Sequence, residues 1–504
     1  MGSADEHFYI VEGVRLVNGD RLFFDDLFVG QSFGLFVMPF VWVYQMIVGS
    51  NEGIVLYMRI IYSLLHSLVG LLFYFHFSER YDSKRVFLAA VAYYLFTPFN
   101  IMALSYNTLS IGFMILASIC FPWIKENNFS SFLAGLFYGC AVLNSPLLAI
   151  GYFLFVFIVI KKKNTRMKTI IWFSIGIGCI AILFLSFVFT RISFSQFKQV
   201  LHLIIDHRHS LGPLRSFIKS GGLLVYYLHV GFIGLLLLII LPILFRKSEK
   251  KELVLNVLFV ISFLIIIWIG FIHTTFIDYG GFAKVLIPFA LLGFAYQLLF
   301  DISFELKAIY WISIFHAFAV SLSSDVGPDS YSCPLITSCM MTILMMKKGS
   351  QSSWKYMSIG FLIVLGYFNI FCFYQGPRAF ETMAKAGPCK GLYDTNERIT
   401  VYEGILKDFD SINKTEGEHI VLVSSECWQY LATTKKVGSG WAYPLFWNKE
   451  DFENMLDIYI QLHEKVAPYL YIQNDNSYQM TKEDPWLSNH SFIEEMSYGI
   501  LYKW

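Results

Sequence analysis

Long apolar blocks divided by short charged clusters are the feature of this sequence that most restricts its fold. Most of the blocks run for roughly 15–24 residues, and a helix of about twenty apolar residues crosses the hydrocarbon core of a bilayer. This pattern predicts a polytopic α-helical membrane protein. Hydrophobic residues make up 56% of the chain and charged residues 15%, an excess over soluble proteins that excludes disordered, fibrous and simple cytosolic classes. The net charge of +1 gives no basic surface for nucleic acid.

The apolar blocks predict twelve membrane-spanning helices, near residues 53–77, 86–97, 107–122, 131–143, 147–160, 169–190, 222–245, 253–273, 282–300, 308–322, 331–346 and 355–375. A further apolar block, 33–48, contains Pro39 and Gly34 and lies beside charged sequence. We interpret this block as an interfacial helix rather than a span. The sequence therefore divides into a first loop, 1–52, and a transmembrane domain, 53–375.

The charges of the loops predict the orientation of the chain in the membrane. Lysine and arginine cluster in alternate connections, near residues 80–85, 161–168, 246–251 and 347–355. By the positive-inside rule these connections are cytoplasmic. The connection 191–221 also carries basic residues, but parity with its neighbours places it outside. Twelve crossings then place both chain ends outside the cytoplasm.

The start of the sequence lacks the features of an insertion signal. It reads MGSADEHFYIVEG, with neither a basic n-region nor an apolar h-region. Together with the parity of the crossings, this predicts one further apolar helix upstream, thirteen in all, which would anchor the first loop.

The last part of the chain, 376–504, has a different composition. It is rich in Asp, Glu, Lys and Asn and contains no apolar run long enough to span a membrane. Residues 421–424 and 468–472 are typical of buried strands, and 396–412 and 451–465 have the apolar spacing of helices. We expect a small extracytoplasmic α/β domain.

Several familiar chemical motifs are missing from the sequence. The eight cysteines form no CxxC or Cys/His metal-binding spacing. Cys389 and Cys427 could form a disulfide if the last domain is extracytoplasmic. The absence of a Gly-rich phosphate loop, HExxH and GxSxG counts against a nucleotide-driven pump, a zinc protease and a typical lipase.

The first loop carries the residues that best fit a chemical role. Asp5 and Glu6 are adjacent carboxylates, which can act as a general base, hold a divalent cation or orient a sugar hydroxyl. A solvated acidic loop is the plain alternative. The apolar residues that follow at helical spacing are expected to face the bilayer: Phe8, Val11, Val14 and Leu16. Asp5 and Glu6 would then begin an interfacial helix, whose dipole favours negative charge there.

This arrangement resembles the GT-C superfamily of membrane glycosyltransferases. The resemblance rests on the Asp5-Glu6 pair and its helix, on the stretch Asn-Gly-Asp-x-Leu-Phe-x-Asp-Asp that ends at Asp26, on the Pro-containing apolar helix, and on Arg59 at the start of the next helix. It is similar to the branch of the protein O-mannosyltransferases and aminoarabinose transferases, including bacterial enzymes of the Rgt type. The resemblance implies a polyprenyl-phosphate-linked sugar donor and transfer on the outer face of the membrane.

The resemblance also implies roles for single residues. Asp5 matches the acid that deprotonates the acceptor hydroxyl, and Glu6 is its neighbour. Arg59 matches an arginine that could pair with the donor phosphate, although snorkelling toward headgroups is an alternative. Asn107 stands where relatives often carry an acid, and because an amide cannot act as a base, it is left with hydrogen bonding to the sugar. Asp26 is a further candidate for substrate binding.

Two later segments supply the remaining candidates. Asp206, Arg208 and His209 resemble an Asp-x-x-His loop whose His and Arg could bind the phosphate leaving group, although a solvated loop is the alternative. Lys284 and Asp278 flank a pair of glycines at the outer mouth of a helix, where charges are costly unless they are paired or functional.

We therefore expect a GT-C type hexosyl- or pentosyltransferase of the bacterial plasma membrane and cell envelope. It would move a sugar from a polyprenyl-phosphate donor to an extracytoplasmic lipid, glycan or protein acceptor, with inversion and an acidic base. The sequence defines no cofactor and no metal-ligand set, and a divalent cation is left open. A twelve-helix secondary transporter or lipid flippase is the alternative, against which stand the terminal domain and the lack of matching halves. An O-antigen-ligase-like enzyme is another.

Overall fold

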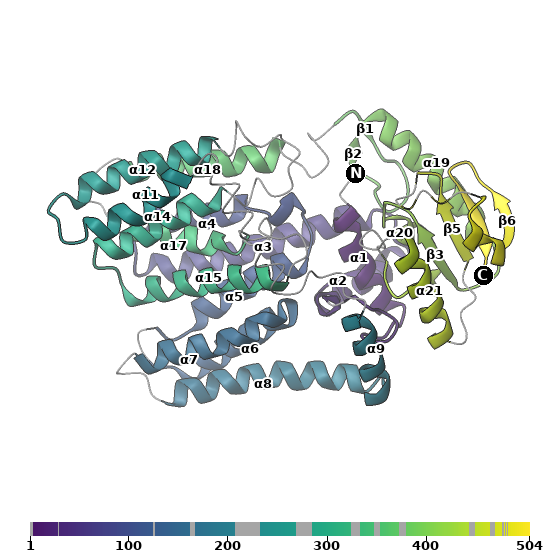
Figure 1. Cartoon of the computed structure of the whole chain (residues 1–504), viewed down its shortest axis with the longest axis horizontal. Coiled ribbons are helices and arrows are strands. Elements are labelled where there is room, and N and C mark those ends of the chain that lie inside the picture. The colour runs from purple at the N-terminus through teal and green to yellow at the C-terminus, as the bar shows by residue number, and fades with distance from the viewer. Residues whose placement is uncertain are drawn as a thin grey trace.

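A helical part and a smaller part with a sheet lie next to each other along the longest axis of the molecule (Figure 1). The computed structural model describes residues 4–28, 30–123, 126–161, 167–206, 232–268, 285–323, 333–346, 353–371, 380–442, 449–463, 469–475, 478, 480 and 482–504. Both chain ends that Figure 1 marks lie toward the part with the sheet.

Each of the twelve predicted apolar blocks overlaps a helix. Their bounds are α3 (Ile54–Ser78), α4 (Ser83–Leu95), α5 (Tyr106–Cys120), α6 (Asn128–Asn144), α7 (Gly151–Lys161), α8 (Met167–Phe189), α11 (Phe232–Leu244), α12 (Lys251–Ile267), α14 (Leu286–Leu299), α15 (Phe304–Ser323), α17 (Leu335–Met345) and α18 (Ser353–Phe371). Helix α9 (Phe194–Asp206) lies in the predicted outer loop between two of them.

Three segments among the described residues are long and apolar enough to cross a membrane, and these are Gln31–Val48, Ile54–Ser78 and Met167–Phe189. The other apolar helices are shorter, so the number of twelve crossings stays a prediction. The first segment comprises the turn η1 (Gln31–Phe33) and α2 (Gly34–Val48). It has the length and hydropathy of a span, whereas its sequence predicted an interfacial helix.

Helix α3 shows two faces of opposite character. Its buried face includes Met58, Tyr62, His66, Phe73 and Phe77. Large apolar side chains are exposed on the other face at a spacing of three to four residues: Ile60, Leu64, Leu68, Leu71 and Phe75. A stripe of this kind fits acyl chains, because soluble proteins rarely expose a continuous apolar patch of this extent.

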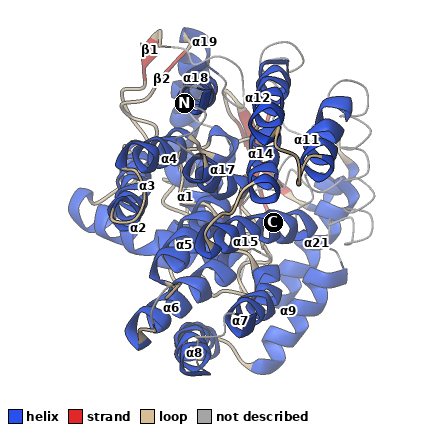
Figure 2. Ribbon diagram, turned by 90° about the vertical axis from the view of Figure 1, so that its left-hand side faces the viewer, coloured by secondary structure: helices blue, strands red, loops and turns tan. Residues whose placement is uncertain are grey.

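The helical part is built from two groups of helices, which both views show (Figures 1 and 2). In one group α6 packs between α5 and α8, and in the other α17 packs against α4, α14 and α15. Gly135 of α6 and Gly176 of α8 allow the first group to pack closely. A Cβ at Gly135 would lie 2.0 Å from the Phe173 carbonyl oxygen, and one at Gly176 would lie 2.3 Å from that of Phe132. Small residues at such a crossing are typical of membrane helices.

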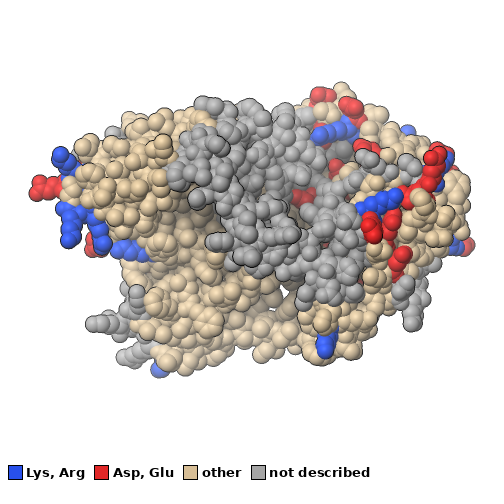
Figure 3. Space-filling view, viewed as in Figure 1, with Lys and Arg blue, Asp and Glu red and all other residues tan. Residues whose placement is uncertain are grey.

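Charge is distributed unevenly over the two ends of the molecule. Figure 3 shows Lys and Arg gathered at the end of the helical part that is remote from the sheet, where Figure 1 places the connection of α11 and α12. The middle of the visible described surface carries few charged residues. The basic connection between α11 and α12 therefore lies at one end of the helical part, and the part with the sheet lies at the other end.

The α/β part contains a sheet of five strands in the order β4-β3-β5-β7-β6. Strand β3 (His419–Val423) runs parallel to both β4 (Lys436–Val437) and β5 (Tyr469–Gln473), and β7 (Gly499–Lys503) runs antiparallel to β5 and β6 (Ser491–Glu495). A small pair, β1 (Thr382–Met383) and β2 (Tyr393–Asp394), precedes them. The helices are α19 (Asn396–Ile412), α20 (Gln429–Ala432) and α21 (Lys449–His463). The two predicted strands and two predicted helices are all present.

Helix α1 (Ala4–Val17) lies where the two parts meet. It packs against α2 and also contacts α3 and α20. The four apolar residues predicted to face the bilayer are all buried inside the protein: Phe8, Val11, Val14 and Leu16. That prediction is wrong because α2 packs against the helix. Contacts with α3 and with the α/β part bury its polar residues as well: Glu6, His7, Glu12 and Arg15.

The two cysteines of the α/β part are not joined to each other. Cys389 and Cys427 are both free and buried. The disulfide that an extracytoplasmic placement would allow between them is therefore not formed in the structure. Cys389 lies instead beside a histidine of α1.

Candidate active site around helix α1

Asp5 and Glu6 occupy the first turn of α1, as the sequence predicted. The unpaired backbone N–H groups at a helix start carry partial positive charge, so this position stabilises carboxylates. Glu6 is 1% exposed, whereas Asp5 is half-buried. Of the two acids, Asp5 is therefore the one with access to a ligand.

Arg59 holds Glu6 in a two-pronged ion pair. Its Nε atom donates to Oε1 at 2.6 Å, and its Nη2 atom donates to Oε2 at 2.8 Å. The side chain of Arg59 is 24% exposed and that of Glu6 is 2% exposed. Paired donors of this kind fix both the position and the plane of a carboxylate. Arg59, which the sequence offered as a phosphate ligand, thus neutralises Glu6 and ties α1 to α3.

His7 connects the same turn to the α/β part. Its Nε2 atom lies 3.7 Å from Cys389 Sγ, and its Nδ1 atom lies 3.8 Å from Glu426 Oε2. Burial lowers the pKa of His7, but its contacts with Cys389 and Glu426 outweigh that effect and raise the pKa to about 9. A charged imidazole is therefore expected here at neutral pH.

The loop that follows β3 reaches this end of α1. Burial raises the pKa of the Cys427 thiol, and the negative charges of Glu426 and Asp5 raise it further. Glu426 of this loop lies 3.8 Å from His7, so the loop contacts the first turn of α1. The carboxyl ends of the parallel strands β3 and β5 are thus at the candidate site, as in many α/β ligand sites.

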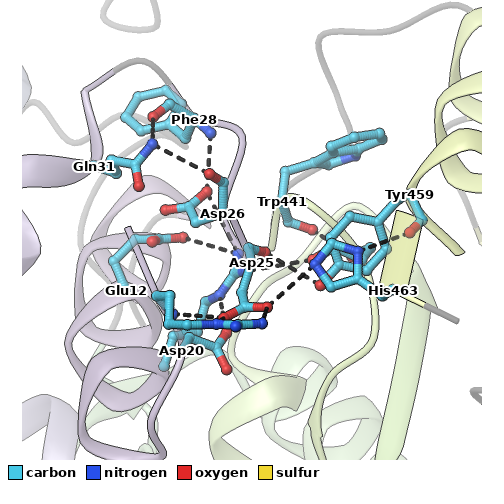
Figure 4. A network of polar contacts seen from close by, with 12 residues as sticks. Glu12, Asp20, Asp25, Asp26, Phe28, Gln31, Trp441, Tyr459 and His463 are labelled. Atoms are coloured by element: carbon cyan, nitrogen blue, oxygen red, sulfur yellow. Dashed lines mark hydrogen bonds and ion pairs between the residues drawn. The ribbon is translucent and has the colours of Figure 1, made fainter. Parts of the chain in front are cut away.

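The second half of α1 is surrounded by a buried polar network (Figure 4). Arg15, which is 2% exposed, donates from Nε to Asp20 Oδ2 at 2.8 Å and from Nη2 to the carbonyl of Ser439 at 3.3 Å. Its Nη2 atom also donates to the carbonyl of Asp25. One arginine therefore binds the first loop to the α/β part.

Two carboxyl groups of the network, those of Glu12 and Asp26, lie near the Nη1 atom of Arg15. Its Nη1 atom lies 3.7 Å from Glu12 Oε1 and 3.6 Å from Asp26 Oδ1. Burial and the neighbouring charge of Asp26 raise the pKa of Glu12 well above its usual range, more than Arg15 lowers it. Glu12 therefore holds its proton more tightly than an exposed glutamate does. Asp26 also accepts from the Phe28 backbone N–H at 2.9 Å.

His463 of α21 completes the network from the α/β part. Its Nε2 atom lies 3.2 Å from Asp25 Oδ1, and its Nδ1 atom donates to the carbonyl of Tyr459 at 2.8 Å. Arg21 donates to Asp25 from Nε at 2.8 Å and from Nη2 at 3.0 Å. Burial raises the pKa of Asp25, but the hydrogen bonds from His463 and Arg21 outweigh it and lower the pKa well below its usual range.

The structure brings some predicted site residues together and separates others. Asp5, Glu6 and Arg59 meet at one end of α1. Asp26 lies against its other half, beside Glu12, which is seven residues or about 10 Å along the helix from Asp5, and it is 3% exposed. Asp26 therefore holds the loop rather than facing Asp5.

Asn107 lies in the first turn of α5 and is buried. Its neighbour Tyr106 packs against Tyr9 of α1, with ring centroids 5.9 Å apart, so the start of α5 adjoins α1. Asp206 ends α9. Four other candidates lie outside the described residues: Arg208, His209, Asp278 and Lys284.

The residues that connect α1 to the α/β part were not among the predicted site residues. His7, Cys389, Glu426 and His463 come from segments up to hundreds of residues apart, and no local spacing indicates them. The Glu12–Arg15 ion pair could have been predicted from the sequence, because residues three apart on a helix face the same side.

A metal ion has no obvious ligand set at this site. Among the described residues, no group of three or more His, Cys, Asp and Glu side chains is arranged to hold one. The two nitrogens of His7 point to different partners, Cys389 and Glu426. These three side chains therefore cannot all bind one ion as they lie.

No protein-family model and no curated protein sequence matches the chain. Solved structures similar to it include the archaeal oligosaccharyltransferase AglB from Archaeoglobus fulgidus, in complex with an inhibitory peptide and a dolichol-phosphate. It is 12% identical with a TM-score of 0.46, and the match covers 94% of this chain and 66% of that one, slightly less than two thirds of its length. Another is ArnT from Cupriavidus metallidurans in the apo state, 11% identical with a TM-score of 0.41, covering 99% and 93% of the two chains. Both are members of the GT-C superfamily, which the sequence resembles.

Proposed function

We propose that the chain is an integral-membrane glycosyltransferase that moves a sugar from a polyprenyl-phosphate donor to an acceptor hydroxyl outside the cytoplasm. The observation that carries the proposal is the placement of Asp5. It is a half-buried carboxylate in the first turn of a helix that lies where apolar helices meet the α/β part. A base in this place can reach a lipid-borne donor and a water-exposed acceptor together. The resemblance of the first loop to GT-C enzymes supports the same reaction.

In the proposed reaction, Asp5 removes the proton of the acceptor hydroxyl as its oxygen attacks the anomeric carbon. The new carbon–oxygen bond forms on the face opposite the phosphate, so the configuration inverts. The bond from the anomeric carbon to the phosphate oxygen breaks, and the lipid phosphate leaves with the bonding electrons. The proton stays on Asp5 until product release.

Cations must stabilise the charge that develops on the departing phosphate. Arg59 uses Nε and Nη2 for Glu6, so we assign it chiefly to positioning. We propose that Arg208 and His209 bind the phosphate, with Lys284 and Asp206 as further ligands of the donor. Asn107, at the start of the helix next to α1, would hydrogen-bond a sugar hydroxyl.

The proposal also includes the placement of the chain in the cell. We propose a bacterial plasma-membrane enzyme with a first extracytoplasmic segment at 1–52, a transmembrane domain at 53–375 and an extracytoplasmic domain at 376–504. The basic connection at the far end of the helical part supports this orientation (Figure 3).

The test compares transfer with transport. The purified chain is reconstituted into vesicles with a panel of radiolabelled polyprenyl-phosphate hexoses and pentoses and with lipid, glycan and peptide acceptors. The proposal expects labelled acceptor and free polyprenyl phosphate in equal amounts. Movement of the intact donor across the bilayer without a labelled product would overturn it in favour of a flippase.

A further inference from the structure

Two consecutive residues of α1, Glu6 and His7, contact different parts of the protein. Successive side chains on an α-helix point about 100° apart. Glu6 therefore reaches α3 through Arg59, while His7 reaches the α/β part through Cys389 and Glu426. Asp5 precedes them both in the same turn. Its position depends on how firmly the two following side chains are held.

The contacts of His7 involve both edges of its ring. Nε2 lies 3.7 Å from Cys389 Sγ, and Nδ1 lies 3.8 Å from Glu426 Oε2. Cys389 belongs to the turn at 387–391, and Glu426 to the loop after β3. His7 is 1% exposed, so it bridges these two segments from within the protein.

The turn that carries Cys389 is itself fixed to the membrane helices. The backbone N–H of Gly53 donates to the carbonyl of Gly387 at 2.9 Å, and that of Val55 donates to Pro388 at 3.2 Å. The Cys389 backbone N–H donates to the Tyr402 hydroxyl oxygen at 3.0 Å. His7 thus contacts a turn that is held at the start of α3.

Glu426 is better placed than Cys389 to respond to a ligand. Its side chain is 29% exposed, whereas Cys389 is fully buried. A fully buried thiol cannot act on a substrate from this position, which excludes Cys389 as a nucleophile. The cluster is therefore suited to holding His7 rather than to chemistry of its own.

We propose that His7 is a positioning residue for Asp5, because Glu426 and Cys389 hold its ring and so couple the docked α/β part to the first turn of α1. This inference rests on the proposed function, in which Asp5 is the base. We call the contacts of His7 with Glu426 and Cys389 the His7 clamp. Through this clamp, catalysis depends on docking of the α/β part, although His7 does not contact the substrate.

The test uses the full chain in lipid nanodiscs and four variants. His7→Phe keeps a ring of similar size but loses both nitrogens, and Glu426→Gln removes the charge opposite Nδ1. Cys389→Ser keeps a group that can donate and accept a hydrogen bond, and serves as the conservative variant. Glu418→Gln, an exposed residue of the same part, is the matched control. The rate and the KM for the donor are measured per folded molecule, with the melting temperature of each variant.

We expect His7→Phe to lower kcat by about 10- to 100-fold, because a small displacement of a reacting group has this effect. The donor KM should not change, and Cys389→Ser should stay close to the wild type. The double variant of His7→Phe and Glu426→Gln should lose no more kcat than His7→Phe alone, since both disturb one clamp.

Three results would overturn the inference. They are an unchanged kcat for His7→Phe, a change confined to KM, and losses that add in the double variant. A wild-type chain with no transfer activity would overturn the proposed function and the positioning role with it. The shifts of melting temperature in the single and double variants would then still report whether His7 and Glu426 are coupled, so the two failures are distinguishable.

Discussion

Arg59 donates hydrogen bonds to both carboxylate oxygens of Glu6, at 2.6 and 2.8 Å, and so joins the first turn of α1 to the start of α3. The carboxylate lies in the interior while the guanidinium keeps partial contact with solvent. Removal of Arg59 therefore leaves an unpaired charge in the interior, whereas removal of Glu6 leaves a cation that solvent can reach.

Arg59→Gln is expected to destabilise the fold by about 3–5 kcal/mol, because it leaves the buried Glu6 carboxylate without its cation. Adding Glu6→Gln should restore part of that loss, since the double variant buries no unpaired charge. Thermal unfolding of both single variants and the double variant in detergent gives the coupling energy. Additive losses would show that the pair contributes little.

Glu12→Gln is expected to be at least as stable as the wild type at pH 8. The raised pKa of Glu12 means that the folded chain binds its proton more tightly than the unfolded chain. Wild-type stability should therefore decline as the pH rises above the ordinary carboxyl range, because deprotonation then favours the unfolded state. Glutamine lacks this titration. The advantage should shrink toward pH 5, and Glu416→Gln at an exposed site should show no such trend.

The raised pKa of His7 predicts that the folded chain loses stability at alkaline pH. Its pKa in the folded chain is about 9, above the ordinary value of 6.5. The stabilisation is present in full below the ordinary value and disappears as the pH rises through about 9. Melting temperatures of the wild type and His7→Phe should converge across that range. Parallel curves would contradict the assignment of the charged imidazole.

Gly440→Ala should loosen the docking of the first loop on the α/β part. The Leu27 backbone N–H donates to the Gly440 carbonyl at 2.6 Å, and a Cβ at Gly440 would lie 2.6 Å from the Leu27 side chain. We expect a loss of about 1–3 kcal/mol, as in overpacked cores. Gly178→Ala in α8 is the control, because a Cβ there meets nothing within 4 Å. Equal melting temperatures for the two variants would refute the clash.

The sequence predicts the elements of this fold well because their signals are local. The apolar blocks are long, and each overlaps a helix. Residues 396–412 form α19, where Thr395 caps the start by accepting from the Arg398 backbone N–H. The exposed strand β6 was not predicted, since all five of its residues are exposed and none of the alternation of a half-buried strand is present.

The surroundings of α1 could not be predicted in the same way. Apolar spacing shows that a helix buries one face, but not that a second part of the chain covers the other. The α/β part supplies that cover, and with it Glu426 and His463. Contacts such as His7 with Cys389 join residues 382 positions apart, and a single sequence holds no local signal for them.

The most direct test of the account is the rate of sugar transfer by Asp5→Asn. The amide has the shape of the carboxylate but cannot accept the acceptor proton. The measurement uses purified protein with a polyprenyl-phosphate sugar that the wild type accepts, and Asp410→Asn on the exposed side of α19 is the matched control. We predict a loss of about 100- to 10,000-fold in kcat for Asp5→Asn and none for the control. Transfer by Asp5→Asn at the wild-type rate would contradict the account.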